Sequence, residues 1–335
     1  MATLLITGGA GFIGSNFVRL AAGALRAQAG QLGDYKIVVV DKLTYAGNVA
    51  SIQSLIDTKQ IEFVKADICD AEAMAQIFAK HGVTHVVHFA AESHVDRSIQ
   101  SSAPFVMTNV VGTQVLLDVA RGRGITKFVH VSTDEVYGTL PEDKPEEKFT
   151  EETPIATNSP YSASKAGSDL LVRAYVHTHN FPACITRCSN NYGPYQFPEK
   201  LIPLFITNLM EDKQVPLYGD GKNVRDWLHV EDHCTAIWRV LSDGRIGEVY
   251  NIGGNNELPN YEITKIVLAA MNKPWDKYVR YVQDRPGHDR RYAIDATKML
   301  RELGWSPAWT FDRGIAATIE WYKANTAWWK PLKKG

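Results

Sequence analysis

The chain has 335 residues, a formal net charge of −1 and 45% apolar side chains, which is the composition of a globular protein with a large core. A net charge near zero gives no general attraction to nucleic acid or to an anionic membrane, so any phosphate must be bound at local sites. We therefore expect small-molecule partners, and neither nucleic acid nor a membrane.

Short β-branched runs alternate with amphipathic stretches through the first half of the chain. They predict strands over residues 3–7, 37–41, 61–66, 84–89 and 127–132, with helices between them. This alternation indicates parallel strands joined by right-handed crossovers, which is an α/β fold with a doubly wound, Rossmann-type parallel sheet. The long interval 21–34 predicts a lengthened helix or loop before the second strand.

The pattern changes after residue 182. A further strand is expected over 183–187, followed by a Pro-, Gly- and Asn-rich stretch over 190–203. We predict that residues 1–182 form a first domain built on the parallel sheet, and that residues 183–335 interleave more sheet strands with a smaller C-terminal lobe. The charge-dense stretch 141–152 is expected to be a solvated loop.

Several sequence features bear on location and metal binding. The four cysteines show no CxxC pairing, which favours buried reduced thiols and a cytoplasmic protein. The histidines lack ligand spacing, so no metal site is expected. We see no signal peptide and no apolar run of about 20 residues, and we expect the aromatic tail 321–329 to pack on the core or on a second subunit.

A glycine-rich loop follows the first expected strand. Gly8, Gly11 and Gly14 satisfy the G-x-x-G-x-x-G pattern at the start of a helix, where small residues let the backbone approach a pyrophosphate. Asp41 ends the second expected strand. A carboxylate there can accept hydrogen bonds from an adenosine ribose and repel a 2′-phosphate, so the cofactor is expected to be NAD rather than NADP.

Two further groups are suited to proton transfer. Tyr161 and Lys165 are four residues apart, so a helix would place both on one face, where the lysine charge can stabilise a phenolate that acts as a base. Asp134 and Glu135 follow the fifth expected strand, at the end where parallel sheets bind ligands. Two carboxyl groups with separated pKa values can serve as an acid and a base. An exposed acidic turn is the alternative.

Four stretches carry a resemblance that extends over essentially the whole chain. Residues 41–48, 90–98, 189–194 and 284–289 read DKLTYAGN, AAESHVDRS, SNNYGP and DRPGHD. With the glycine loop and the Tyr161/Lys165 pair, they make the chain similar to extended short-chain dehydrogenases/reductases, and among these to the dTDP-glucose 4,6-dehydratases. Related 4-epimerases typically lack the Asp-Glu pair, and related decarboxylases usually have serine in place of Asp134.

The resemblance implies an NAD-dependent hydro-lyase that converts dTDP-glucose to dTDP-4-keto-6-deoxyglucose by C4 oxidation, loss of water across C5 and C6, and return of the hydride to C6. Tyr161 would take the C4 hydroxyl proton beside Lys165, and Thr133 would orient the C4 oxygen. Glu135 would remove the C5 proton while Asp134 protonates the departing C6 hydroxyl. The alternatives are a 4,6-dehydratase for another nucleotide sugar, a nucleotide-sugar 4-epimerase, and an NAD-binding regulator without catalysis.

The resemblance also implies a homodimer and two sets of binding residues. The positions implied for NAD are Gly8, Gly11, Phe12, Ile13, Gly14, Asp41, Lys42, Thr44, Asp67, Ile68, Ala90, Ala91, Ser93, Thr108, Tyr161, Lys165 and Asn190. Those implied for the nucleotide sugar are His94, Thr133, Asn190, Asn191, Lys200, Leu201, Pro216, Tyr218, Arg225, Asn260, Arg285 and His288. Arg225 would clamp the diphosphate; an ion pair with Asp226 or Asp232 is the alternative.

Overall fold

A parallel sheet forms the centre of the computed structural model, which describes residues 2–23 and 35–333. Within these residues it has seven strands in the order β10-β6-β5-β4-β1-β2-β3, with every neighbouring pair parallel. The strands are β1 (Ala2–Thr7), β2 (Tyr35–Asp41), β3 (Glu62–Lys65), β4 (His85–His88), β5 (Lys127–Thr133), β6 (Ala183–Cys188) and β10 (Val249–Ile252). The predicted doubly wound α/β fold is confirmed.

The strands form where the sequence predicts them because their side chains are buried on both faces of the sheet. All residues of β5 and β6 are buried, and so are the last five of β2. The strand β10, a short run at the sheet edge that pairs with β6, was not predicted from the sequence. Its residues come from the second half of the chain.

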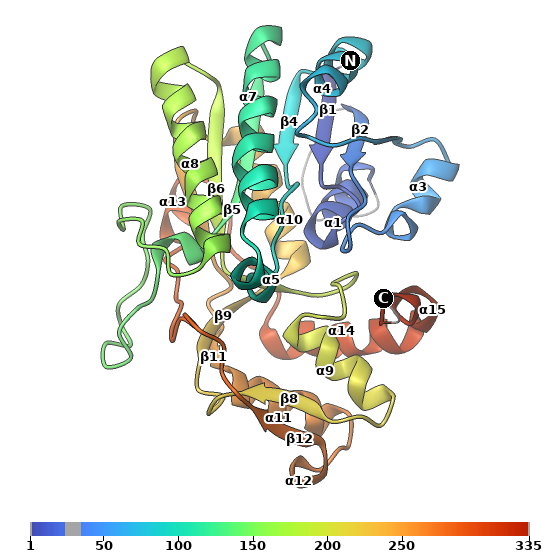
Figure 1. Ribbon diagram of the computed structural model, residues 1–335, viewed down its shortest axis with the longest axis vertical. Helices are drawn as coiled ribbons and strands as arrows, with labels where there is room; N and C mark the ends of the chain where they lie inside the picture. The colour runs from blue at the N-terminus through green and yellow to red at the C-terminus, as the bar shows by residue number, and fades with distance from the viewer. Residues whose placement is uncertain (1, 24–34, 334–335) are drawn as a thin grey trace.

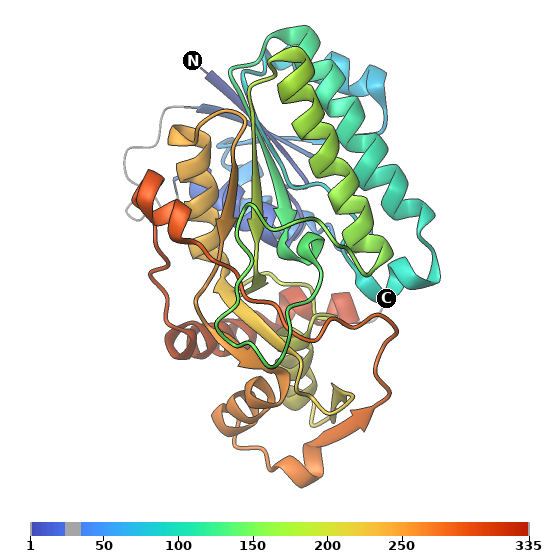
Figure 2. The ribbon, with the colours of Figure 1, turned by 90° about the vertical axis from the view of Figure 1, so that its left-hand side faces the viewer.

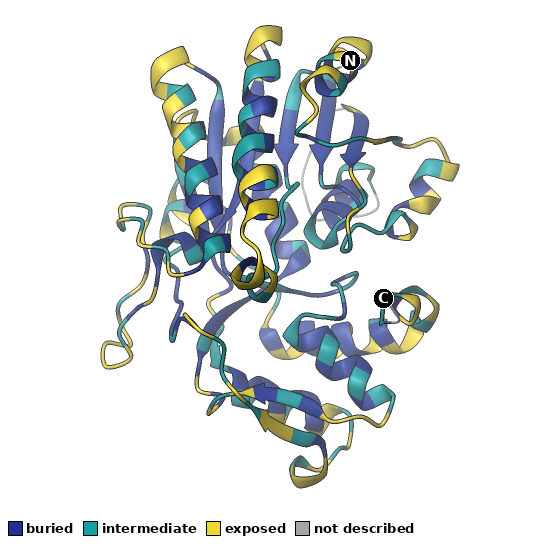
Figure 3. Cartoon of the chain, in the orientation of Figure 1, coloured by how far each residue is buried: buried dark blue, intermediate teal, exposed yellow. Residues whose placement is uncertain are grey.

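Helices cover both faces of the sheet (Figures 1 and 2). On one face, α4 (Ala71–His81), α7 (Gly112–Arg123) and α8 (Pro160–His179) pack on the strands in one core cluster. On the other, α1 (Phe12–Ala21), α10 (Val230–Asp243) and α13 (Thr297–Leu303) share a second cluster with the strands. Burial is accordingly greatest on the strands and on the inward sides of these helices (Figure 3).

A smaller lobe lies beyond the carboxyl ends of the central strands (Figure 1). It has its own core cluster and two small sheets, of order β11-β9-β7 and β12-β8. Its elements are β7 (Asn190–Tyr192), α9 (Leu201–Met210), β8 (Val215–Tyr218), β9 (Val224–His229), β11 (Glu257–Pro259), α11 (Asn260–Ala270), α12 (Trp275–Tyr278), β12 (Val279–Val282), α14 (Phe311–Ala324) and α15 (Thr326–Trp329).

The aromatic tail joins this lobe to the first domain. Tyr322 and Trp329 are fully buried in the lobe core. Trp328 donates a hydrogen bond from Nε1 to Ser51 Oγ at 3.1 Å, on the short helix η1 (Val49–Ser51). The tail thus packs on the core, which is one of the two arrangements expected from the sequence.

Short elements and loops make up the rest of the described chain. They include α3 (Gln53–Asp57), α5 (Val95–Gln100), α6 (Ala103–Phe105), the π-helical turn η2 (Val106–Val111), η3 (Asp134–Tyr137) and η4 (Pro331–Lys333). The stretch 141–152 is a largely exposed loop, as predicted, although Phe149 is buried and bridges to Ile294. Most of the interval 21–34, predicted as a lengthened helix or loop, lies outside the described residues.

One helix bears on the expectation that the chain has no membrane span. Residues 103–123 form a continuous helix of 21 residues, long and apolar enough by length and composition to cross a membrane. Its sequence is not an uninterrupted apolar run, because polar residues such as Thr108 and Asn109 lie within it. In the structure the helix packs against α4 and α8. The apolar side chains of its second half, such as Val115 and Leu116, belong to the core of the sheet, whereas Val106 and Met107 in its first half are exposed.

Candidate active site

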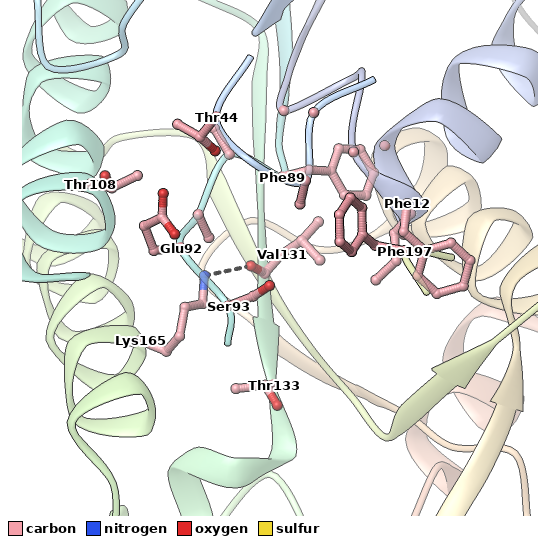
Figure 4. A pocket seen from close by; sticks show the side chains of 18 of the residues that line it. Phe12, Thr44, Phe89, Glu92, Ser93, Thr108, Val131, Thr133, Lys165 and Phe197 are labelled. Carbon is pink, nitrogen blue, oxygen red and sulfur yellow. Dashed lines mark hydrogen bonds between the residues drawn. The ribbon is translucent and has the colours of Figure 1, made fainter. Parts of the chain in front are cut away.

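A cavity of about 310 Å³ opens at the carboxyl ends of the central strands. It lies where the strand order reverses, between β1 and β4, which is the position where sheets of this kind bind ligands. Every residue that the sequence analysis assigned to NAD lines this cavity. Figure 4 shows part of the lining, with Thr44, Thr108 and Lys165 projecting toward the same space as Phe12 and Phe197.

The glycine loop is shaped by close backbone contacts. Gly8 has a φ of +70°, and a Cβ there would lie 2.5 Å from the backbone N of Ala90. A Cβ on Gly14 would lie 2.2 Å from Gly8 O. Gly11 is the N-cap of α1 and offers no side-chain hydrogen bond to the first N–H groups of the helix. The first helical residues, Phe12 to Gly14, line the cavity, so their N–H groups form a site for an anion.

Asp41 is fixed beside this loop by backbone donors. Its two carboxylate oxygens accept hydrogen bonds from Ala10 N at 2.9 Å and Leu43 N at 2.8 Å. Burial raises the pKa of Asp41, and these two N–H groups oppose that shift. Each oxygen keeps a free lone pair, so the carboxylate can still accept from ribose hydroxyls. Asp67, at the end of the next strand, pairs with Lys42 at 2.6 Å.

Tyr161 and Lys165 lie on the first turns of α8. The helix starts there because Ser159 caps it in a reciprocal capping box and Pro160 occupies the first turn. Both side chains are buried and line the cavity. The Lys165 ammonium donates to the Val131 carbonyl at 2.8 Å (Figure 4).

The surroundings of Tyr161 act on its pKa in the opposite sense to the Lys165 charge. Burial, and then the charge of Glu135, raise the pKa of Tyr161 well above its usual value. Lys165 by itself therefore does not supply the lowered tyrosine pKa that the pair suggested, since its ammonium is directed at a β5 carbonyl and the nearby carboxylates act in the opposite sense. Positive charge from a bound ligand has to add to that of Lys165.

The buried ammonium of Lys165 predicts a pH-dependent stability. Burial lowers the pKa of Lys165 from 10.5 to about 8. Between these pH values the unfolded chain holds this proton and the folded chain does not, so the free energy of unfolding should rise with pH by up to about 3 kcal/mol relative to Lys165→Met. Urea unfolding of both proteins at pH 7, 8, 9 and 10 measures this, and a stability difference that stays constant over the series would contradict it.

Asp134 and Glu135 form the start of η3, directly after β5. Thr133 caps this turn by accepting a hydrogen bond from Glu135 N at 3.3 Å. Asp134 is only 1% exposed, which removes the exposed acidic turn as an interpretation. Burial, and then Glu135, raise the pKa of Asp134 well above its usual value.

Glu135 has different surroundings from Asp134. Burial raises the pKa of Glu135, but three cations oppose this shift: Arg285, Arg225 and Lys200. The two neighbouring carboxyls therefore differ in how firmly they hold a proton. Asp134 is suited to give up a proton as an acid, and Glu135 is suited to act as a carboxylate base.

The residues assigned to the nucleotide sugar divide into two groups. Thr133, Asn190, Asn191 and Lys200 line the cavity. The others lie outside its lining: His94, Leu201, Pro216, Tyr218, Arg225, Asn260, Arg285 and His288. Arg225 and Arg285 of the second group and Lys200 of the first lie near Glu135, since all three lower the pKa of its carboxyl. A basic region therefore adjoins the acid–base pair.

Arg225 does not form either of the ion pairs considered as an alternative. Its guanidinium donates to backbone carbonyls, including that of Asp289 at 2.8 Å, and lies over the Tyr292 ring at 4.2 Å. Asp226 and Asp232 instead accept hydrogen bonds from backbone N–H groups of other segments. The planar cation is thus held rigidly by the backbone, and its role as a diphosphate clamp stays a prediction.

Part of the lining was missed by the sequence analysis. The missed residues are Val40, Ala46, Gly47, Ala66, Phe89, Glu92, Val131, Ser132, Cys188, Ser189, Gln196, Phe197 and Glu199. Most are strand ends or neighbours of assigned positions. Gln196, Phe197 and Glu199 belong to the Pro-, Gly- and Asn-rich stretch that had been noted only as irregular. Among the described residues, no cluster of three or more His, Cys, Asp or Glu side chains could hold a metal ion.

Comparison with known proteins agrees with this geometry. The family model described as GDP-mannose 4,6 dehydratase matches residues 5–318. The chain belongs to this family. Among curated members, the dTDP-glucose 4,6-dehydratase of Streptomyces niveus is 53% identical over 331 residues, covering 98% of this chain and 95% of that protein.

Solved structures that are similar to this chain share one fold but include enzymes named for different reactions. DesIV, a dTDP-glucose 4,6-dehydratase from Streptomyces venezuelae solved with NAD and TYD bound, has a TM-score of 0.93 and 52% identity, covering 98% of this chain and 99% of that one. A UDP-glucose 4-epimerase from Thermus thermophilus, solved with NAD, has a TM-score of 0.86 at 29% identity, covering 96% and 99%. The backbone is thus shared by dehydratases and epimerases, and the residues of the site have to distinguish them.

Proposed function

We propose that the chain catalyses the NAD-dependent dehydration of dTDP-glucose to dTDP-4-keto-6-deoxyglucose. The observation that carries this proposal is the pair of Asp134, which is buried, and Glu135, which is half-buried, in the same cavity as Tyr161. An epimerase needs one base at C4, whereas loss of water across C5 and C6 needs a further acid and a further base. The identity of 53% to a dTDP-glucose 4,6-dehydratase supports the same assignment.

The residues of the cavity fit NAD. The glycine loop leaves no room for a Cβ at Gly8 or Gly14 and directs the N-terminus of α1 at the site of a diphosphate. Asp41 is placed for an adenosine ribose. Asn190 Oδ1 is buried beside the cavity without a hydrogen-bond partner in the described chain. When bound, NAD would accept a hydride from the sugar and later give it back.

We expect Gly14→Ala to weaken NAD binding at least ~10-fold, because its Cβ would lie 2.2 Å from Gly8 O and would push the loop out of shape. The cofactor released per mole of purified protein on denaturation measures this. The matched control is Gly122→Ala, on α7, where a Cβ meets no atom within 4 Å. A Gly14→Ala protein with a full complement of cofactor would show that the loop does not hold the diphosphate.

The acid and base groups of the chain have separate tasks in this reaction. Tyr161, as the phenolate, takes the proton of the C4 hydroxyl, while Lys165 balances the phenolate charge and Thr133 holds the C4 oxygen. A ketone at C4 acidifies the C5 proton, which Glu135 removes. Asp134, whose pKa burial raises, holds a proton that it can give to the departing C6 hydroxyl. Glu135 then returns its proton to C5.

The proposal also gives a separate role to each of the two parts of the chain. Residues 1–182 would hold NAD and the acid–base groups, and residues 183–335 would supply the nucleotide-sugar lobe. The basic side chains Lys200, Arg225 and Arg285 gather beside Glu135, where they would bind the diphosphate. We also propose a homodimer, as expected from the family, and a cytoplasmic location, which the free thiols of the described chain support.

Mass spectrometry of nucleotide sugars incubated with the purified holoenzyme tests the proposed reaction. Loss of one water from dTDP-glucose, without added reductant, is the expected result. Loss of water only from a UDP, CDP or GDP sugar would keep the reaction and overturn the nucleotide. A 4-epimer without loss of water would overturn the dehydratase.

A further inference from the structure

We propose that Asp169, held by Arg187, is a positioning residue of the same reaction: it keeps the Lys165 ammonium charged from inside the core, behind the cavity. This proposal builds on the proposed function for its catalytic consequence. It concerns a buried ion pair that the mechanism above does not use and that no residue assignment from the sequence included.

Asp169 lies on α8 four residues after Lys165, one helical turn further into the core. Its side chain is 1% exposed. The carboxylate accepts a hydrogen bond from Arg187 Nε on β6 at 2.8 Å, and its other oxygen is 3.3 Å from His130 Nε2 on β5. Asp169 therefore connects α8, which carries the catalytic pair, to two strands of the sheet.

A buried ion pair in this position needs an explanation beyond stability. Replacing such a pair with apolar side chains is often neutral or stabilising, because the desolvation of two charges offsets their attraction. Asp169 has a second charged neighbour besides Arg187, because Lys165 lies one turn before it on the same helix, and each of the two favours the charged form of the other. Burial works against the ammonium of Lys165, and Asp169 is the first group that opposes burial in setting the pKa of Lys165.

The charges around Lys165 leave Asp169 as its main counter-charge. The titratable groups that act on Lys165, or on which it acts, are Asp169 on its own helix, His88 on β4, His130 on β5 and Cys188 on β6. The charged groups of the other elements packed on α8 are Asp134 and Glu135 of η3, Asp96 and Arg97 of α5, and Asp118, Arg121 and Arg123 of α7.

Of these groups, few can supply a negative charge near Lys165. Burial lowers the pKa of His130 to about 4 and that of His88 well below its usual value, so both are neutral at neutral pH. Burial also raises the pKa of Cys188, which stays a thiol. Asp169, by contrast, is held in the charged form, because His130 and Arg187 outweigh the effect of burial on its pKa.

Arg187 also connects the pair to the catalytic turn. Its guanidinium lies over the ring of Tyr137, the last residue of η3, at 4.8 Å. The Tyr137 hydroxyl in turn donates to Asn251 Oδ1 on β10 at 2.8 Å. The same cation therefore contacts the carboxylate behind Lys165 and the turn that begins with Asp134 and Glu135. This arrangement fixes the two halves of the acid–base site relative to each other.

The test compares Asp169→Asn with the holoenzyme of the parent chain. We expect the alkaline limb of the kcat profile to move to lower pH by about one unit or more in Asp169→Asn, while KM is unchanged, because Lys165 loses its proton more readily. Asp169→Glu, which keeps the negative charge, should have the alkaline limb of its kcat profile at the parental pH. Ser168→Ala is the matched control, since it removes a buried hydrogen bond to His130 at 3.1 Å without changing any charge, and it should leave the limb in place.

A second readout does not depend on turnover. In the parent, the free energy of unfolding relative to Lys165→Met should begin to rise near pH 8. In the Asp169→Asn background, the same difference, measured against Asp169→Asn/Lys165→Met, should begin to rise at lower pH. If the chain turns over no nucleotide sugar, the proposed function fails while this comparison still decides the role of Asp169. Should Asp169→Asn not fold, the double variant Asp169→Asn/Arg187→Met, which removes both charges, takes its place. An unshifted limb and an unshifted onset of the stability gain would overturn the proposal.

Discussion

Replacing Tyr161 with phenylalanine is expected to lower kcat for dTDP-glucose by about 10²- to 10⁴-fold while the purified protein still carries NAD. The substitution removes only the hydroxyl, so the ring packing against Phe105 remains. Without the phenolate no group takes the C4 hydroxyl proton, and the first step fails. Steady-state kinetics together with the cofactor content of the protein provide the measurement.

A tyrosine on the same helix serves as the control for this prediction. Tyr175 lies further along α8, and its hydroxyl donates to Asp118 Oδ1 at 2.7 Å on the surface side. Tyr175→Phe should therefore keep the parental kcat. If Tyr161→Phe retained more than about a tenth of the parental kcat, Tyr161 would not be the base for the C4 hydroxyl.

Glu135→Gln is expected to stop the loss of water almost completely and to stop exchange of the C5 hydrogen with solvent. The amide keeps the size of the side chain but cannot accept the C5 proton. Oxidation at C4 does not use Glu135, so it should persist, and the reduced cofactor should build up on the protein. Incubation in D₂O followed by mass spectrometry of the recovered sugar nucleotide measures the exchange, and absorbance at about 340 nm follows the cofactor.

Asp134→Asn distinguishes the acid from the base. Since Asp134 would act on the C6 hydroxyl, its amide should slow the loss of water by about 10²-fold or more and leave exchange at C5 in place. The opposite pattern, with exchange lost in Asp134→Asn and kept in Glu135→Gln, would interchange the two roles. Parental exchange in both variants would mean that neither carboxyl is the C5 base.

The fold and the glycine-loop side of the cavity were predictable because local sequence determines them. A β-branched run such as that of β2 is buried on both faces wherever it lies in a parallel sheet. The glycine loop has few alternatives to its observed shape, since Gly8 and Gly14 admit no side chain. Residues at strand ends, such as Asp41 and Ala90, then reach the cavity as a consequence of the sheet order.

The lobe side of the site was less predictable because it depends on contacts between distant segments. Arg225 and Asp289 are far apart in sequence, and no local pattern shows that the guanidinium is held by that carbonyl. The raised pKa of Tyr161 likewise results from the burial of Tyr161 and from Glu135 on another element. The counter-charge of Lys165 was also missed, although Asp169 stands four residues after it, because only the packing of β5 and β6 shows that this carboxylate is buried.

The most direct test of the account follows the hydrogen at C4 of the sugar. dTDP-glucose carrying deuterium at C4 should give a 4-keto-6-deoxy product with the deuterium at C6, because the hydride leaves C4 and returns to the same molecule. NMR or mass spectrometry of the product locates the label. Deuterium that stays at C4, with or without inversion there, would contradict the account, and so would a product that has lost the label to solvent.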